Sequence, residues 1–243
     1  MPCGTTPSAI RVSARCFKKI KCFGANPGHF SCEVRMTRLY LIRHAETLGN
    51  LSGEFQGSTD CELSERGVDQ LEKLSERARA FEFEKLYVSP LTRAQRTAQA
   101  VNRHHGAPCE TLAEISEINC GAWERQPWTA LAERYPDEMR LWREAPHDFL
   151  SPQGESMREV YDRMTGALAR VVRAHQGKSV AVVSHGCAIR NALCWLHGLP
   201  FERLCEMPWV HNTSITCVDF DDEMRPHVVF EDDYAHVIGM VKL

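Results

Sequence analysis

Short apolar runs alternate with longer amphipathic stretches along this chain. The apolar runs predict strands at residues 38–42, 85–89 and 179–184. The stretches with a period of three to four residues predict helices at residues 64–81, 92–104, 155–175 and 187–196. Strands that alternate with helices favour a mainly parallel sheet covered by helices on both faces. We therefore expect an α/β three-layer sandwich, with residues 213–220 and 227–230 as edge strands.

The helix predicted at residues 64–81 shows the pattern most clearly. Ser64 is a suitable N-cap, because its hydroxyl can accept a hydrogen bond from a free backbone N–H of the first turn. The expected buried face consists of Val68, Leu71, Leu74, Ala78 and Phe81. Before this helix, residues 49–60 are polar and contain glycine, which predicts a loop.

Two segments do not follow the alternating pattern. Residues 1–35 have no periodicity and carry six basic side chains against one acidic one, so we expect a disordered leader or a misassigned start, with translation beginning at Met36. Residues 36–243 are expected to form one domain, with a small cap insertion around residues 111–152. The remaining chain carries 23 basic and 31 acidic residues, which argues against nucleic-acid binding.

The spacing of the cysteines and the lengths of the apolar runs indicate the redox compartment of the protein and whether it crosses a membrane. Eleven cysteines are present, but none are spaced as C-x-x-C, and several occupy apolar patterns where a small hydrophobic residue would fit. We therefore expect reduced thiols in a cytoplasmic protein, and neither a metal site nor another cofactor. No apolar run reaches the roughly 20 residues that cross a bilayer, so no membrane contact is expected. A homodimer is compatible with this sequence.

Candidate chemistry lies where the predicted parallel strands end. The first strand ends in Arg43-His44, the second is followed by Arg93, and the third ends in Ser184-His185-Gly186. Because ligands bind beyond the carboxyl ends of such strands, we expect these side chains at one edge of the sheet. Imidazole is a nucleophile near neutral pH, and guanidinium holds two phosphate oxygens. Gly186 is expected to permit a tight turn, and the N-terminal N–H groups of the helices starting near residues 92 and 186 to favour an anion.

Phosphoryl transfer through histidine also needs a group that gives a proton to the leaving oxygen. Glu114, Glu117 and Glu124 all lie in one segment that could supply a carboxyl group, and their positions alone do not choose between them. Trp123, Trp128 and Trp142 either stack on a substrate or pack a cap. Arg140 and Arg143 are either solvated helix charges or grip a second anionic group of the substrate.

The ordered motifs resemble those of the histidine phosphatase superfamily, in the branch related to phosphoglycerate mutase. They span residues 37–220 and are Arg43-His44-Ala45-Glu46-Thr47 with Asn50, Leu63-Ser64 with Gly67, Ser89-Pro90-Leu91-Thr92-Arg93, Glu117 with Gly121 and Trp123-Glu124, Gly154-Glu155-Ser156, and Val183-Ser184-His185-Gly186. This resemblance implies a phosphoglycerate mutase-like fold with His44 as the phosphorylated nucleophile and Glu117 as proton donor. Arg43, Arg93 and His185 would bind the phosphoryl group, and Asn50 and Gly186 would line the substrate site.

The resemblance implies a metal-independent phosphatase that hydrolyses a small phosphorylated metabolite through a phosphohistidine intermediate. The alternatives are a cofactor-dependent phosphoglycerate mutase and a catalytically silent phosphate-binding regulatory protein. No adjacent arginine pair for a substrate carboxylate is present, which favours hydrolysis, and α-ribazole phosphate is one candidate substrate. Two residues depart from the family pattern. Ala45 and Arg125 each stand at a position where the family pattern has glycine. Arg125 is expected to add positive charge at the pocket mouth.

Overall fold

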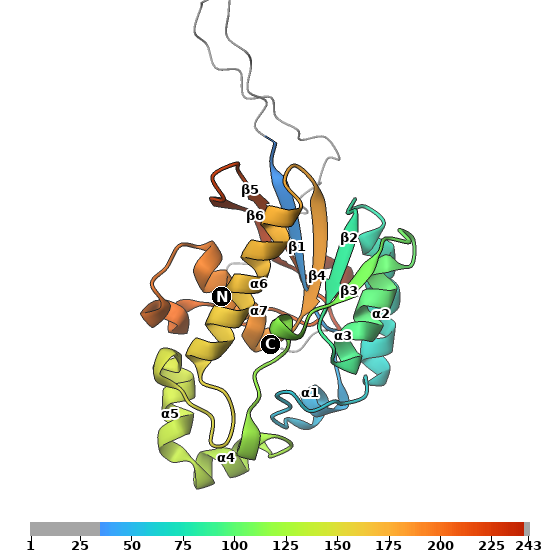
Figure 1. The fold of residues 1–243 in the computed structure, drawn as a ribbon. Helices are drawn as coiled ribbons and strands as arrows, with labels where there is room; N and C mark the ends of the chain where they lie inside the picture. The colour runs from blue at the N-terminus through green and yellow to red at the C-terminus, as the bar shows by residue number, and fades with distance from the viewer. Residues whose placement is uncertain (1–34, 241–243) are drawn as a thin grey trace, which may run out of the picture. The chain divides into compact units, whose positions relative to one another are not determined.

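A six-stranded mixed sheet forms the centre of the fold (Figure 1). The computed structural model describes residues 35–240. In spatial order the strands are β3 (Cys109–Thr111), β2 (Lys85–Val88), β4 (Ser179–Ser184), β1 (Thr37–Arg43), β5 (Ile215–Phe220) and β6 (Pro226–Asp233). The first four are parallel to one another, whereas β5 is antiparallel to both of its neighbours, β1 and β6. The predicted α/β sandwich with a mainly parallel sheet is therefore confirmed.

Helices cover both faces of this sheet. Their bounds are α1 Leu48–Ser52, α2 Glu65–Ala78, α3 Thr92–Asn102, α4 Trp128–Arg134, α5 Pro136–Glu144, α6 Met157–Ala174 and α7 Gly186–Leu196. Short 3-10 helices are η1 Ala113–Ile115, η2 Gly121–Trp123, η3 Pro146–Asp148, η4 Phe201–Glu206 and η5 Ala235–Val237. None of the helices within residues 35–240 combines the length and the apolar character that a membrane span requires.

The alternation of side chains along β1 explains the two layers of helices. Successive residues of a strand point to opposite faces, so Leu39 and Leu41 pack with α6 and α7, whereas Tyr40 and Ile42 pack with α2 and α3. All four side chains are buried. Strands covered on both faces become continuously apolar, which is why β1 and β4 were recognisable in the sequence.

A third apolar cluster lies between α7 and the chain that connects β3 to α6. Its largest fully buried side chains are Trp123 and Phe149, and Trp142 and Leu204 pack in the same cluster. The segment around residues 111–152 therefore packs, through α4, α5 and the loops that flank them, against α6, α7 and η4.

Several details differ from the expectations. Strand β5 is flanked by β1 and β6, so it is not an edge strand, and the second edge is β3, which is too short to give a pattern. The expected loop at residues 49–60 contains α1. Helix α2 has Ser64 as N-cap, as expected, but ends at Ala78. Val68 was wrongly assigned to its buried face and is 41% exposed.

Candidate active site

His44 follows β1 directly and is buried at the carboxyl edge of the parallel strands. Its Nδ1 lies 2.7 Å from the carbonyl oxygen of Ala45. A carbonyl oxygen only accepts, so Nδ1 carries the proton and Nε2 keeps its lone pair. Burial, followed by the charges of Arg93 and Arg43, lowers the pKa of His44 well below its ordinary value. His44 is therefore a neutral imidazole with a free nucleophilic nitrogen.

Arg43 lies beside His44 and reaches across to another part of the chain. Its Nη1 donates to the carbonyl oxygen of Val210. The guanidinium passes so close to α7 that a Cβ on Gly186 would lie 3.3 Å from both Cζ and Nε of Arg43. The φ angle of Gly186 is not positive, so the tight turn expected there is not the reason for glycine. Glycine instead lets the guanidinium approach the helix.

Arg93 comes from the first turn of α3 and is almost completely buried. Its Nη1 donates to the carbonyl oxygen of Thr59 at 2.8 Å, and its Nη2 to that of Gly57 at 2.7 Å. The carboxylate of Glu124 holds the same loop, because it accepts from the backbone and hydroxyl groups of Ser58 and from the hydroxyl of Thr59. Glu124 thus supports the position of Arg93 without touching it.

His185 occupies the N-cap position of α7, immediately after β4. The centroids of the His185 and His44 rings are 5.1 Å apart. Its Nε2 lies 2.6 Å from the hydroxyl of Ser89, a residue that follows β2. Burial, then the charge of Arg93, lowers the pKa of His185 well below its ordinary value. Two neutral histidines therefore lie side by side between two arginines.

Glu117 fills the N-terminus of α7. Its Oε2 accepts from the backbone N–H of Cys187 and its Oε1 from that of Ala188, each at 3.1 Å. At the start of α3, Asp60 likewise accepts from the backbone N–H of Thr92 at 2.7 Å. Carboxylates of the chain therefore occupy the N–H groups of Thr92, Cys187 and Ala188, so these three do not serve a bound anion as expected.

Buried donors without a partner point to an anion at this site. Nine buried side-chain nitrogen and oxygen atoms of residues 35–240 have no hydrogen-bond partner, and three of them belong to these side chains: Arg43 Nε, Arg93 Nε and His185 Nδ1. Buried polar nitrogen atoms in folded proteins are nearly always paired, so an unpaired group marks a place for a ligand or water. Three such atoms around His44 suit the oxygens of a phosphoryl group.

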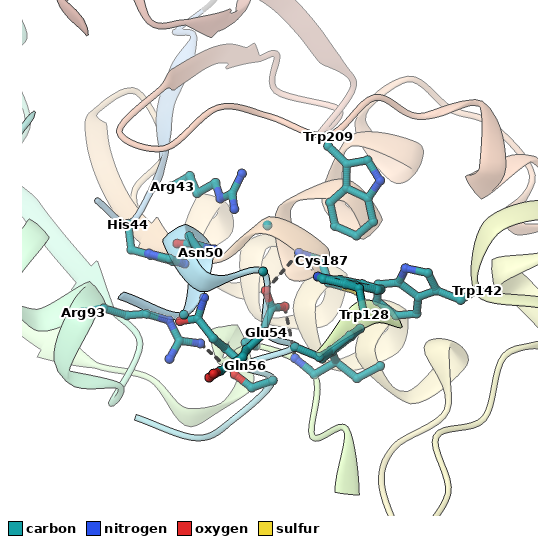
Figure 2. A pocket seen from close by; sticks show the side chains of 17 residues that line it. Arg43, His44, Asn50, Glu54, Gln56, Arg93, Trp128, Trp142, Cys187 and Trp209 are labelled. Atoms are coloured by element: carbon teal, nitrogen blue, oxygen red, sulfur yellow. Dashed lines mark hydrogen bonds between the residues drawn. The ribbon is translucent and has the colours of Figure 1, made fainter. Parts of the chain in front are cut away.

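These side chains meet at a cavity of about 280 Å³ (Figure 2). Of the residues expected in the site, Arg43, His44, Asn50, Arg93, Glu117 and Gly186 line it, and His185 lies against His44. Glu114 and Glu124 do not line it, which separates Glu117 from the two alternatives that the sequence left open. In the described part of the chain, no cluster of three or more His, Cys, Asp or Glu residues is arranged to hold a metal ion.

Comparison with known proteins agrees with this geometry. A family model for the histidine phosphatase superfamily (branch 1) matches residues 39–233. The chain belongs to this superfamily. It is 34% identical to phosphoserine phosphatase 1 of Hydrogenobacter thermophilus over 168 residues, which are 69% of this chain and 80% of that protein.

A second relative is named as a different kind of enzyme. The probable phosphoglycerate mutase GpmB of Cronobacter sakazakii is 34% identical over 189 residues, 76% of this chain and 86% of its own. Among solved structures, Bacillus stearothermophilus YhfR superposes with a TM-score of 0.78 at 30% identity, covering 83% of this chain and 99% of that one. A relative named as a phosphatase and one named as a probable mutase are therefore equally identical to this chain in sequence, at 34%.

Arg125 is placed differently from what the resemblance to histidine phosphatases suggested. It is exposed and does not line the cavity, so it adds no charge at the pocket mouth there. Its φ is +61°, a conformation that glycine adopts without strain. This backbone geometry gives a physical reason for the glycine that often stands here in histidine phosphatases. Arg140 and Arg143 are exposed as well and lie outside the lining.

The sequence-based site of this histidine phosphatase lacked several lining residues, among them Glu54, Gln56 and Trp209. Glu54 and Gln56 follow α1, in the segment expected to be a plain loop, and Trp209 lies in the irregular chain between η4 and β5. None of them belongs to a periodic pattern. For Trp209 the available signal was a single large aromatic residue in a short irregular segment that follows Pro208. Of the tryptophans considered, Trp128 and Trp142 line the cavity, while Trp123 is buried in the third apolar cluster.

Proposed function

We propose that this protein is a phosphatase that hydrolyses a small phosphomonoester through a phosphohistidine on His44. The observation that carries the proposal is the protonation state of the His44 imidazole. Its Nδ1 proton is held by the Ala45 carbonyl, and burial keeps its pKa low, so Nε2 is available for attack at neutral pH. Membership of the histidine phosphatase superfamily supports this chemistry.

In the first step, Nε2 of His44 attacks phosphorus, and the bond from phosphorus to the alcohol oxygen breaks. Arg43, Arg93 and His185 bind the equatorial oxygens, and their donors lie in a dry site where charge stabilisation is strong. Asn50 and the backbone at Gly186 line the same space. The two guanidinium groups supply the positive charge that balances the phosphoryl oxygens.

Glu117 gives a proton to the departing alcohol oxygen. Water then enters, and the same carboxylate takes one proton from it as the oxygen attacks phosphorus. The bond from nitrogen to phosphorus breaks, inorganic phosphate leaves, and His44 and Glu117 return to their starting states. The hydrogen bonds from Cys187 and Ala188 support this role, because they fix the carboxylate in the cavity wall.

We also propose that the segment around residues 111–152 acts as a cap of the domain that contains the site. Trp128 of α4 and Trp142 of α5 support this role, because both contribute to the cavity wall. A cytoplasmic location is part of the same proposal. It is supported by the seven cysteines within residues 35–240, all of which are free thiols.

The test is turnover of para-nitrophenyl phosphate in the presence of a chelator, with wild type and His44→Ala compared. We expect release of nitrophenol and inorganic phosphate in equal amounts from the wild type and a loss of activity of at least about 1000-fold in the variant. An acid-labile phosphoenzyme should be trapped in the wild type only. Turnover that persists in His44→Ala, or that requires a metal ion, would overturn the proposal.

A second measurement distinguishes the proposed phosphatase from a mutase. With 3-phosphoglycerate, the proposal predicts that any phosphoryl group removed appears as inorganic phosphate, whereas a mutase returns the phosphoryl group and forms 2-phosphoglycerate. The charges in the cavity favour hydrolysis, because Arg43 and Arg93 lie at the phosphoryl end and no other lysine or arginine of residues 35–240 lines it to hold a substrate carboxylate. Isomerised product without free phosphate would contradict the assignment.

A further inference from the structure

The cavity wall away from His44 is aromatic. Figure 2 shows Trp128, Trp142 and Trp209 on one side of the cavity and the phosphoryl-binding residues on the other. Phe55 packs into the same wall, with its ring centroid 4.6 Å from that of Trp128 and 5.0 Å from that of Trp142. Four aromatic rings from separate segments of the chain therefore surround the space that a leaving group would occupy.

Trp209 is the exposed member of this wall. Its ring is stacked with that of Trp142 at 5.8 Å between centroids and an interplanar angle of 28°, yet 45% of the residue remains exposed. The guanidinium carbon of Arg190 lies 4.7 Å from the Trp209 centroid, and Arg190 is itself fixed by the carbonyl oxygen of Met207. Trp142 and Arg190 thus hold the indole ring of Trp209 in place, while part of Trp209 remains exposed to solvent.

The cavity wall away from Arg43 and Arg93 carries the negative charge of Glu54. Glu54 lines the cavity, and within residues 35–240 its side chain takes part in no hydrogen bond or ion pair. The lining cations are Arg43 and Arg93, both beside His44. A second anionic group on a substrate would therefore meet the carboxylate of Glu54, and within residues 35–240 no arginine or lysine besides Arg43 and Arg93 lines the cavity to pair with it.

We infer that the preferred substrates are phosphomonoesters of an alcohol or phenol that carries a flat aromatic group and no negative charge of its own. This inference rests on the proposed phosphatase function and names its substrate class. Contact of a flat ring with the exposed part of Trp209 would cover that surface, and aromatic pairs add to the free energy of apolar burial. Glu54 discriminates by repulsion, since a like charge in a partly enclosed site is unfavourable.

The first test measures the contribution of Trp209. The substrates are 2-phenylethyl phosphate and ethyl phosphate, which release alcohols of similar reactivity but differ in the ring. We expect Trp209→Ala to lower kcat/KM for the phenyl substrate by about tenfold and to leave that for ethyl phosphate nearly unchanged. An equal loss on both substrates would overturn stacking, because it would show that the substitution disturbs Arg43 through the neighbouring Val210.

The second test measures the contribution of Glu54. The substrates are 4-carboxyphenyl phosphate and 4-carbamoylphenyl phosphate, which have the same shape and differ in charge. We expect the wild type to prefer the amide by about tenfold or more, and Glu54→Gln to remove most of that preference. Glu82→Gln removes an equal charge from an exposed position outside the cavity and should leave the preference intact.

The outcomes separate this inference from the proposed function. Hydrolysis of all four esters with no preference for the ring or for the neutral group would overturn the substrate class and leave the phosphatase intact. A failure to hydrolyse any ester, together with an unphosphorylated His44, would remove the phosphatase itself. A preference for the carboxylate in the wild type would contradict the role of Glu54 directly.

Discussion

Glu124 should control activity although it does not line the cavity. Its carboxylate accepts from the backbone N–H of Ser58 at 2.8 Å, the hydroxyl of Ser58 at 2.7 Å and the backbone N–H of Cys120 at 3.0 Å, and from the hydroxyl of Thr59. Although burial acts in the opposite direction, the hydrogen bonds from Thr59 and Ser58 hold the pKa of Glu124 below its usual value. Glu124→Ala removes all four contacts at once.

The size of the effect follows from these contacts. A hydrogen bond contributes about 0.5–1.5 kcal/mol net, and Glu124 is only half-buried, so we expect Glu124→Ala to lower the free energy of unfolding by about 3 kcal/mol. The carbonyl oxygens that hold Arg93 belong to the same loop. A displacement of about 1 Å at a catalytic group costs on the order of 100-fold, so kcat/KM should fall by about 10-fold to 100-fold.

The assay is steady-state hydrolysis of para-nitrophenyl phosphate together with urea unfolding, for Glu124→Ala, Arg93→Ala and the double variant. If Glu124 acts through Arg93, its replacement should have little further effect on kcat/KM once Arg93 is absent. Glu82→Ala, at an exposed position, serves as the control. Independent and additive losses in the double variant would refute the reasoning, as would wild-type kcat/KM in Glu124→Ala.

Three further outcomes are expected. Burial lowers the pKa of His44 and His185, so below about pH 6.5 the unfolded chain binds protons that the folded chain does not. As the pH falls below this value, the free energy of unfolding should therefore decrease by about 1.4 kcal/mol per pH unit for each histidine. Urea unfolding at a series of pH values in phosphate-free buffer should show that the free energy of unfolding depends less steeply on pH in His44→Gln. Arg125→Gly should leave kcat/KM unchanged, since Arg125 does not line the cavity, and a clear change would place it in the site. His211 follows Val210, whose carbonyl oxygen holds Arg43. Asp232→Asn weakens the two hydrogen bonds that Asp232 accepts from His211, at 2.7 and 2.6 Å, and should lower kcat/KM by about fivefold, whereas an unaltered value would show that this contact does not support the site.

The sequence predicted the sheet and the strand-end chemistry because both follow from local rules. A strand buried on two faces is continuously apolar, so β1 and β4 were visible, and the residues that follow them, His44 and His185, could be placed at one edge. Ser64 and the face of α2 followed from capping and periodicity. Glu117 was different, because the family resemblance and not the residue pattern selected it.

The remaining features depend on contacts between distant segments, which no local pattern contains. Trp209 belongs to the cavity wall because a loop after η4 returns to α5, and Glu54 because the chain after α1 turns inward. Whether helix N–H groups are free also depends on distant residues, since Glu117 comes from a segment 70 residues before Cys187. Strand β3 was missed because a three-residue strand exposed throughout has no alternation to detect.

The short segment from Trp209 to Thr213 has a consequence for engineering substrate range. It contributes the carbonyl of Val210 to Arg43, the side-chain amide of Asn212 to the carbonyl of His44 at 2.9 Å, and the ring of Trp209 to the wall. Leaving-group recognition and nucleophile placement therefore share one stretch of backbone. Libraries that vary the Trp209 side chain alone should shift selectivity, whereas insertions or deletions in this stretch should abolish turnover for every ester together.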